Sequence, residues 1–414
     1  MSVWGRRLVL VTVNVVVFVV CAELLALVVY YEQTGRLFYT YRKTLPVIEE
    51  TAQGALTGDA LHPYFGPIHR PGVRPETNNI GFGSPRKYPF SRTDDRQFLV
   101  GIFGGSVGRQ FCDRGAPRMI ASLLRSAVFA GRDVVPLCFA HEGYKQPQQL
   151  LVLAYFLSIG QQFDLAINID GFNEVALGTY NDDRGRDISM PSPIHIDPLI
   201  NLIDRSTMTP AMAESLAAIN RYKQRLNDLA GRIQGNDVAA VNFVLERLFE
   251  RTLNQYQSEL ARFAGLPPNP SDASLVQVTP SVRPRNASTL YEDIAAGWAA
   301  ASRLMNDLLA ARSVPYIHVL QPNQYFTSRR FDDAEARVAL NATTPFKPPV
   351  ERGYPVLQRA GDDLKARERF FDATAIFDNE PAAVYSDDCC HYTQRGNDLL
   401  ADFIAARVLE TMAQ

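Results

Sequence analysis

Residues 98–110 read "FLVGIFGGSVGRQ", and this stretch decides how the chain folds. Its apolar run, 98–103, is short and continuous, as in a strand buried on both faces of a parallel sheet. Gly104 and Gly105 let the backbone turn sharply without a Cβ clash. Ser106 then stands where open α/β sheets place their sites. Since the stretch matches neither the dinucleotide fingerprint nor the P-loop, Ser106 is a candidate nucleophile, with a helix-capping role as the alternative.

The segments that follow alternate between strand and helix signals. Helical spacing at 116–130 is followed by a second strand at 133–140, and a helix signal at 145–160 by a third strand at 163–170. A fourth strand, 314–322, comes only after a long helix signal at 289–313. This alternation predicts an α/β fold, a three-layer α/β/α sandwich with a central parallel sheet of about five strands.

A long insertion separates the third strand from that helix. It covers residues 181–285, far more than an ordinary connection between a strand and a helix. Its second half, 209–265, has apolar residues at helical spacing and predicts a helical hairpin packed on the sheet; partner binding through 209–265 is the alternative. The chain thus has five segments: an anchor, 1–31; a linker and surface lead-in, 32–95; a first core part, 96–180; the insertion, 181–285; and a second core part, 286–414.

The N-terminus carries a long apolar run at residues 8–30. As a helix it would reach roughly 35 Å, enough for the hydrocarbon core of a bilayer. Arg6 and Arg7 precede it, which favours a cytoplasmic N-terminus. We therefore expect a single-pass membrane anchor with the bulk of the chain periplasmic or extracellular; a cleaved signal peptide is the alternative.

Composition narrows the function further. With 42 basic and 44 acidic side chains the net charge is −2, so there is no electrostatic footprint for nucleic acid. The five cysteines include no C-x-x-C pair of the kind that binds zinc. Either one of the adjacent Cys389 and Cys390 pairs with Cys112 or Cys138, or both stay thiols.

A nucleophilic serine needs a base, and His391 is the best placed of six histidines. It lies in a loop before the last helix signal, after the strand-like segment 370–377, so it can reach the carboxyl edge of the sheet. Asp388, three residues earlier, is the candidate that orients its imidazole. Together they predict a triad of Ser106, His391 and Asp388.

Acyl transfer also needs hydrogen-bond donors for the developing oxyanion. The second and third strands end near Gly143, in "HEGYKQP", and Asn173, in "DGFNEV". The N–H groups of Ser106 and Gly143 and the side-chain amide of Asn173 are therefore the candidate donors. The alternatives are that Gly143 only needs a positive φ and that Asn173 only holds a turn.

The order of these residues resembles that of the SGNH hydrolases, the GDSL-like esterase and lipase superfamily, in its membrane-anchored bacterial form. "FGGSVGRQ", "EGYKQPQQL", "DGFNEV" and "DDCCHYTQRGNDLLA" look like its blocks, over roughly residues 96–180 and 286–414. Two departures are Gly105, where the family commonly has Asp, and Glu174, which replaces another acid. The insertion has no counterpart there.

The resemblance implies a serine esterase that works through an acyl-enzyme and needs no metal or organic cofactor. Its expected substrate is an O-acyl ester, of the acetyl type, on a cell-envelope glycan or lipid. Two alternatives stay open: an O-acyltransferase with the same triad, and a non-catalytic envelope protein that binds a polymer or an assembly partner.

Overall fold

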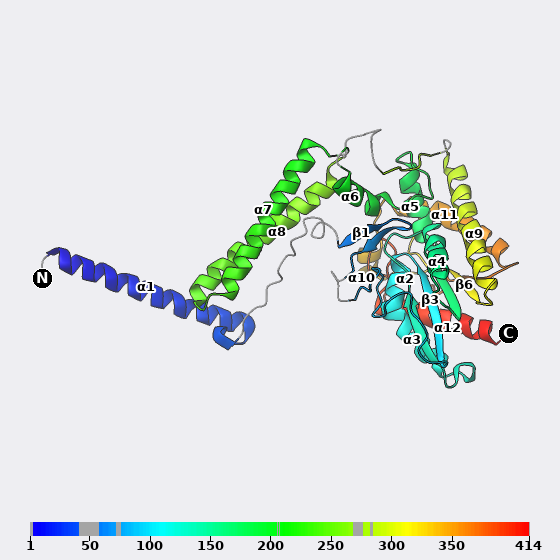
Figure 1. Cartoon of the computed structure of the whole chain (residues 1–414), viewed down its shortest axis with the longest axis horizontal. Coiled ribbons are helices and arrows are strands. Elements are labelled where there is room, and N and C mark those ends of the chain that lie inside the picture. Colours follow the sequence, from blue (N-terminus) through cyan, green and yellow to red (C-terminus); the bar gives the residue numbers. More distant parts are fainter. Residues whose placement is uncertain are drawn as a thin grey trace. The chain divides into compact units, whose positions relative to one another are not determined.

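The computed structural model describes residues 3–40, 58–71, 76–204, 206, 208–267, 276–281 and 285–413 (Figure 1). The chain divides into two compact units. One combines residues 1–57 with 201–275, and the other combines residues 58–200 with 276–414. The second unit therefore includes the beginning and the end of the segment that the sequence marks as an insertion.

The core of the second unit is a five-stranded parallel sheet in the order β4-β3-β5-β6-β7. Its strands are β3 (Gln97–Gly104), β4 (Asp133–Cys138), β5 (Leu165–Asp170), β6 (Tyr316–Leu320) and β7 (Arg369–Asp372). The predicted α/β class and the parallel sheet of about five strands are confirmed.

Alternate residues of β3 serve the two faces of the sheet. Val100 and Ile102 pack in one cluster with Met119 of helix α3 (Ala116–Leu124) and Ile404 of helix α12 (Gln394–Met412). Leu99 and Phe103 pack in the other cluster, against helix α4 (Gln148–Ser158). Because both faces are buried, the strand reads as a continuous apolar run.

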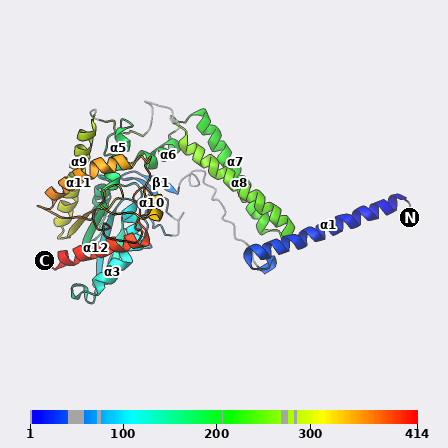
Figure 2. The ribbon, with the colours of Figure 1, turned by 180° about the vertical axis from the view of Figure 1, so that it is seen from behind.

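Helices complete the two outer layers. On one face, α3 (Ala116–Leu124) and α12 (Gln394–Met412) lie side by side in both views (Figures 1 and 2). The other helices of this unit are α2 (Ser106–Gln110), α4 (Gln148–Ser158), α5 (Phe172–Asp182), α6 (Pro193–Ile203, whose last residues fall in the other unit), α9 (Ala287–Ala310), α10 (Asp333–Ala339) and α11 (Lys347–Leu364), with short turns η2 (Phe111–Gly115) and η3 (Ala127–Phe129).

A small antiparallel hairpin precedes the sheet in the chain. It consists of β1 (Asp59–His62) and β2 (Gly66–His69), and Asp59 is the register partner of His69. Buried residues of β2 and its flanks join the apolar cluster that contains α4. The hairpin thus lies within the predicted surface lead-in and is anchored on the core.

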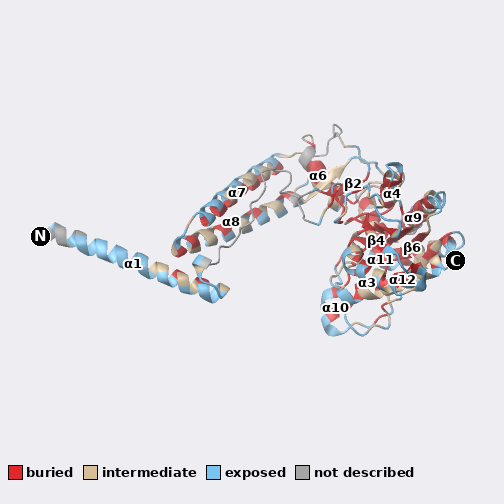
Figure 3. Ribbon diagram, turned by 60° about the horizontal axis from the view of Figure 1, so that its bottom comes forward, coloured by how far each residue is buried: buried red, intermediate tan, exposed pale blue. Residues whose placement is uncertain are grey.

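The other unit is helical. It contains α1 (Val3–Thr34), η1 (Phe38–Thr40), α7 (Pro210–Gln234) and α8 (Ala239–Gly265). Along α7 and α8 buried residues alternate with exposed ones, and the buried ones form one cluster between the two helices (Figure 3). The sequence predicted a helical hairpin over 209–265, and α7 and α8 form it; the compact unit that holds this hairpin also holds α1.

Helix α1 is long and apolar enough over Val9–Thr34 to cross a membrane. Its surface is almost entirely exposed (Figure 3). Near its middle the carboxylate of Glu23 accepts hydrogen bonds from the N–H groups of Ala239 and Ala240, at 2.8 and 2.9 Å. These N–H groups belong to the first turn of α8, where a helix leaves donors without intrahelical partners. Glu23 therefore caps the insertion hairpin.

Candidate active site

Ser106 is the first residue of α2, directly after the end of β3. Gly104 has φ +146°, and a Cβ atom there would lie 2.3 Å from the carbonyl oxygen of Ile169 on the neighbouring strand. Only glycine fits this close approach of two backbones. The turn therefore holds Ser106 at the carboxyl end of the sheet, as the sequence predicted.

The side chain of His391 contacts that of Ser106. Its Nε2 atom lies 2.7 Å from Oγ of Ser106, and its Nδ1 atom is hydrogen-bonded to a carboxylate oxygen of Asp387. Because that carboxylate accepts, Nδ1 carries the proton and Nε2 is free to accept the hydrogen bond from the serine. The loop before α12 thus brings two of the predicted residues together from 285 positions apart.

The carboxylate at the ring belongs to Asp387 and not to Asp388, which corrects the sequence prediction. The other carboxylate oxygen of Asp387 accepts hydrogen bonds from three N–H groups of the turn that follows. These belong to Cys389, Cys390 and His391, at 3.0 to 3.2 Å. The carboxylate of Asp388 instead accepts a hydrogen bond from Nδ2 of Asn341 at 2.7 Å. The local turn therefore selects the acid.

Asp387 is held in its ionised form. Burial raises the pKa of its carboxyl group, but the hydrogen bond and the charge of His391, together with the backbone N–H groups, outweigh burial and lower the pKa below its usual range. A carboxylate that stays charged keeps the proton on Nδ1 of His391.

Asn173 also reaches the serine turn. It lies in the first turn of α5, and a Cβ atom on Gly105 would lie only 2.1 Å from its Nδ2 atom. The same amide donates to the carbonyl oxygen of Tyr144 at 2.8 Å. The structure therefore brings the predicted amide beside the backbone of Ser106.

Gly143 lies in the loop after β4, at φ +75°. A Cβ atom there would lie 2.4 Å from the ring of His195, so glycine suits the position for its conformation and for its space. Its loop touches both neighbouring parts of the site, because His141 donates its N–H to the carbonyl oxygen of Gly104 at 3.2 Å and Tyr144 accepts from Asn173.

Two cysteine thiols lie in the loop that carries His391. The Sγ atoms of Cys389 and Cys390 are 2.8 Å apart, and the buried Cys390 side chain interacts with that of Ser106. Of the two alternatives stated from the sequence, the structure has the one in which both adjacent cysteines stay thiols; Cys112 pairs with Cys138, a disulfide that the sequence analysis did not name.

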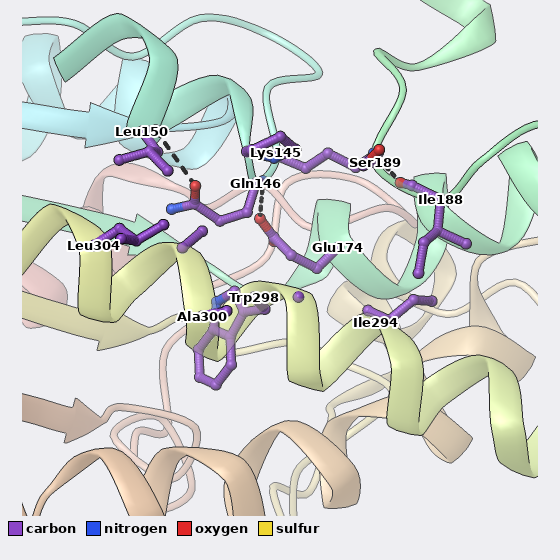
Figure 4. Close-up of a pocket in the computed structure, with 13 residues that line it drawn as sticks. Lys145, Gln146, Leu150, Glu174, Ile188, Ser189, Ile294, Trp298, Ala300 and Leu304 are labelled. Atoms are coloured by element: carbon purple, nitrogen blue, oxygen red, sulfur yellow. Dashed lines mark hydrogen bonds between the residues drawn. The ribbon is translucent and has the colours of Figure 1, made fainter. Parts of the chain in front are cut away.

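A cavity of about 280 Å³ is lined by Lys145 and Gln146 from the loop after β4 and by Glu174 of α5 (Figure 4). Most of its walls are apolar, from α4, α5 and α9, including Leu150, Ile294 and Trp298. Two buried charged residues, Lys145 and Glu174, also line it. Sequence reasoning missed the cavity because its walls come from four separated segments.

Burial shifts the pKa values of the two ionisable residues of this cavity in opposite directions. Burial lowers the pKa of Lys145 to about 8, and its ammonium group donates to the carbonyl oxygen of Ile188. Burial and the charge of Asp170 raise the pKa of Glu174. The carboxyl group of Glu174 accepts the N–H of Gln146 at 2.9 Å, which ties its helix to the loop after β4 (Figure 4).

Comparison with known proteins adds little. No protein-family model matches the chain, and no curated protein does. Among solved structures, a lipase from a goat rumen metagenome, Lip_vut3, is similar over 75% of this chain and 97% of its own, with 10% identity and a TM-score of 0.31. A similarity of this size carries no argument about activity.

Proposed function

We propose that this protein is a serine hydrolase of the SGNH type that cleaves an ester through an acyl-enzyme. The contact of Oγ of Ser106 with Nε2 of His391, whose other nitrogen is bonded to Asp387, carries the proposal. Nucleophile, base and orienting carboxylate in this geometry define the general arrangement of serine hydrolases on unrelated folds.

Each residue then has a stated task. Oγ of Ser106 attacks the ester carbonyl carbon while its proton moves to Nε2 of His391. The imidazolium returns this proton to the leaving alkoxide as the C–O bond breaks, which leaves the acyl group on the serine. Water, deprotonated by Nε2, then attacks the acyl carbon; the bond from this carbon to Oγ breaks, the imidazolium returns the proton to Oγ, and the acid is released. Asp387 stabilises the imidazolium throughout.

The oxyanion of the tetrahedral intermediate takes its hydrogen bonds from the N–H groups of Ser106 and Gly143 and from Nδ2 of Asn173. Support comes from the close approach of Asn173 to Gly105 and from the contacts that tie the loop of Gly143 to the serine turn. Removal of one such donor costs other hydrolases about 10²- to 10³-fold in rate.

The expected substrate is an O-acyl ester of a cell-envelope glycan or lipid. This rests on α1 as a single-pass anchor that keeps the catalytic unit near a membrane, with the N-terminus cytoplasmic and the bulk outside. The hairpin of α7 and α8 would then lie close to the same membrane, because Glu23 of α1 caps α8.

The same three residues also serve an O-acyltransferase, since a sugar hydroxyl can replace water as the acceptor. A non-catalytic envelope protein that binds through the cleft or through 209–265 is a third candidate. The short contact between Ser106 and His391 favours the two catalytic candidates over this one.

Labelling by a fluorophosphonate probe tests the proposal on the full chain in detergent. The wild type should be labelled, and Ser106→Ala and His391→Ala should both abolish labelling. Ser122→Ala, on α3 away from the site, should label like the wild type. A folded wild type that resists the probe would contradict the hydrolase and the transferase alike.

A further inference from the structure

A second group of ionisable residues lies outside the triad, where the β1–β2 hairpin meets the loop after β4. Asp59 and His69 face one another across the hairpin as register partners, so their side chains emerge on the same side. The loop contributes His141 and Glu142. Both histidines are at most 4% exposed, and neither belongs to the proposed triad.

His69 is held between two carboxylates. Its Nδ1 atom is 2.7 Å from Oδ1 of Asp59, and its Nε2 atom is 3.1 Å from Oε2 of Glu142. A histidine that donates one ring N–H to a carboxylate is the arrangement that orients many metal-binding imidazoles. The contact with Glu142 has the length of a hydrogen bond, and an ion would replace its proton, since with metal–ligand distances of about 2.0 to 2.2 Å two donors of one ion lie roughly 3 to 3.5 Å apart.

His141 offers a nitrogen that the protein leaves unused. Its Nδ1 atom is 3.0 Å from the carbonyl oxygen of Glu142, and because a carbonyl only accepts, this nitrogen carries the proton. Nε2 therefore bears the lone pair. Within the described residues this buried atom has no hydrogen-bond partner, a costly arrangement for a polar atom.

The donors lie close enough for one ion. One donor atom each of Asp59, His69 and His141 lies within 4.8 Å of the other two. Oε2 of Glu142 lies 3.8 Å from the protonated Nδ1 of His141, so this carboxylate borders the group. His195 packs against Gly143 in the same loop, and its buried Nδ1 atom likewise has no partner among the described residues.

We propose that Asp59, His69 and His141, with Glu142 beside them, form a binding site for one divalent transition-metal ion of the zinc type. Imidazole nitrogens together with carboxylate oxygens, and no thiolate, suit zinc and its first-row neighbours, whereas calcium and magnesium prefer oxygen alone. The charge also fits, because the divalent cation would replace the proton that His69 holds between the two carboxylates.

The ion would hold the loop of Gly143 in place. His141 is bonded through its N–H to Gly104 in the serine turn, and Tyr144 of the same loop accepts from Asn173. The metal would therefore join the β1–β2 hairpin to the loop with a proposed oxyanion donor, without touching the reacting atoms. The binding site itself does not depend on the proposed function.

The test uses the full chain in detergent, stripped of metal by a chelator and titrated with Zn²⁺. Bound zinc after desalting and the shift in melting temperature are both measured. Since Cys389, Cys390 and His391 could also hold an ion, the titration is repeated on the chain with both cysteines changed to serine. That chain should still bind one Zn²⁺ and melt at a higher temperature with the ion than without it.

His141→Gln and Asp59→Asn should each weaken zinc binding in this background by at least 10-fold and reduce the shift in melting temperature. His62→Gln is the matched control, because His62 lies in the same hairpin but stacks on Phe65, and it should bind like its parent. Loss of all zinc with the two cysteines, unchanged affinity in His141→Gln, or a melting shift with Ca²⁺ and none with Zn²⁺ would each overturn the proposal.

Discussion

A Cβ atom on Gly105 would lie 2.1 Å from Nδ2 of Asn173, so the amide occupies the space that a side chain would need. The resembled family commonly has Asp at this position, yet here the absence of a side chain is what lets the amide approach the serine turn. The carbonyl oxygen of Tyr144 also lies 3.0 Å from that Cβ position, which leaves a new methyl group little room.

We therefore expect Gly105→Ala to displace Asn173 and to lower the rate of fluorophosphonate labelling by about 100-fold or more, the usual effect of losing an oxyanion donor. The chain should remain folded. Gly231→Ala is the control, because a Cβ atom in that helix meets open space and should leave labelling unchanged. Wild-type labelling of Gly105→Ala would argue against a role for Asn173.

Asp387 and Asp388 form a matched pair for testing which acid orients the base. Asp387→Asn should lower the second-order rate of labelling by about 10²- to 10⁴-fold, because an amide in place of the carboxylate favours the wrong tautomer of His391. Asp388→Asn should change the rate by less than about 5-fold, since its carboxylate binds Asn341. The reverse order of effects would restore the assignment made from the sequence.

The lowered pKa of Asp387 predicts how the ionisation of its carboxyl group depends on pH. A carboxyl group whose folded-state pKa lies below the ordinary value stays ionised at any pH above that value. Asp387 should thus stay ionised between pH 5 and 8, and the carbon-13 NMR signal of its carboxyl group, assigned by its absence in Asp387→Asn, should be constant over that range. A carboxyl signal that moves between pH 5 and 8 would show that Asp387 titrates there.

The thiol pair should make the site sensitive to small thiol reagents. Methyl methanethiosulfonate adds a methylthio group to an accessible cysteine, and Cys389 is partly exposed next to the buried Cys390, which interacts with Ser106. Treatment should therefore block fluorophosphonate labelling of the wild type. The chain with both cysteines changed to serine should be labelled equally with and without the reagent, although Cys21 still reacts; inhibition of this chain would place the effect elsewhere.

Because Lys145 is buried, the free energy of unfolding should change with pH in the alkaline range. Its folded-state pKa of about 8 is below the ordinary value of 10.5, so the unfolded chain binds more protons between these values and the folded state gains stability as pH rises through them. Below pH 8 the buried charge of Lys145 lowers the free energy of unfolding by its full amount, about 3 kcal/mol.

Lys145→Met removes that penalty. It should melt at a higher temperature than the wild type at pH 7, and the difference should shrink by pH 10.5. Lys87→Met, at an exposed position, should show no such trend. A wild type that is more stable than Lys145→Met at pH 7 would mean that the hydrogen bond to Ile188 outweighs the cost of burying the charge.

The sequence by itself determined the sheet and the chemical types of the proposed triad. A buried parallel strand must be apolar on both faces, and a sharp turn needs glycine, so 98–106 predicts β3 and the position of Ser106. The length of a continuous apolar run predicted α1, and periodicity predicted α7 and α8, because a helix repeats its pattern over many residues. The histidine was found because it lies in a loop directly before a helix.

Only the tertiary structure decided which carboxylate serves that histidine. Asp387 and Asp388 are chemically the same and adjacent, and the choice depends on three backbone N–H groups that turn Asp387 toward the ring. The cavity beside Lys145 and the cluster around His69 were equally hidden, since their members are far apart in sequence and each alone reads as an ordinary polar residue. Sequence patterns record local geometry, whereas contacts between distant segments appear only when the chain is folded.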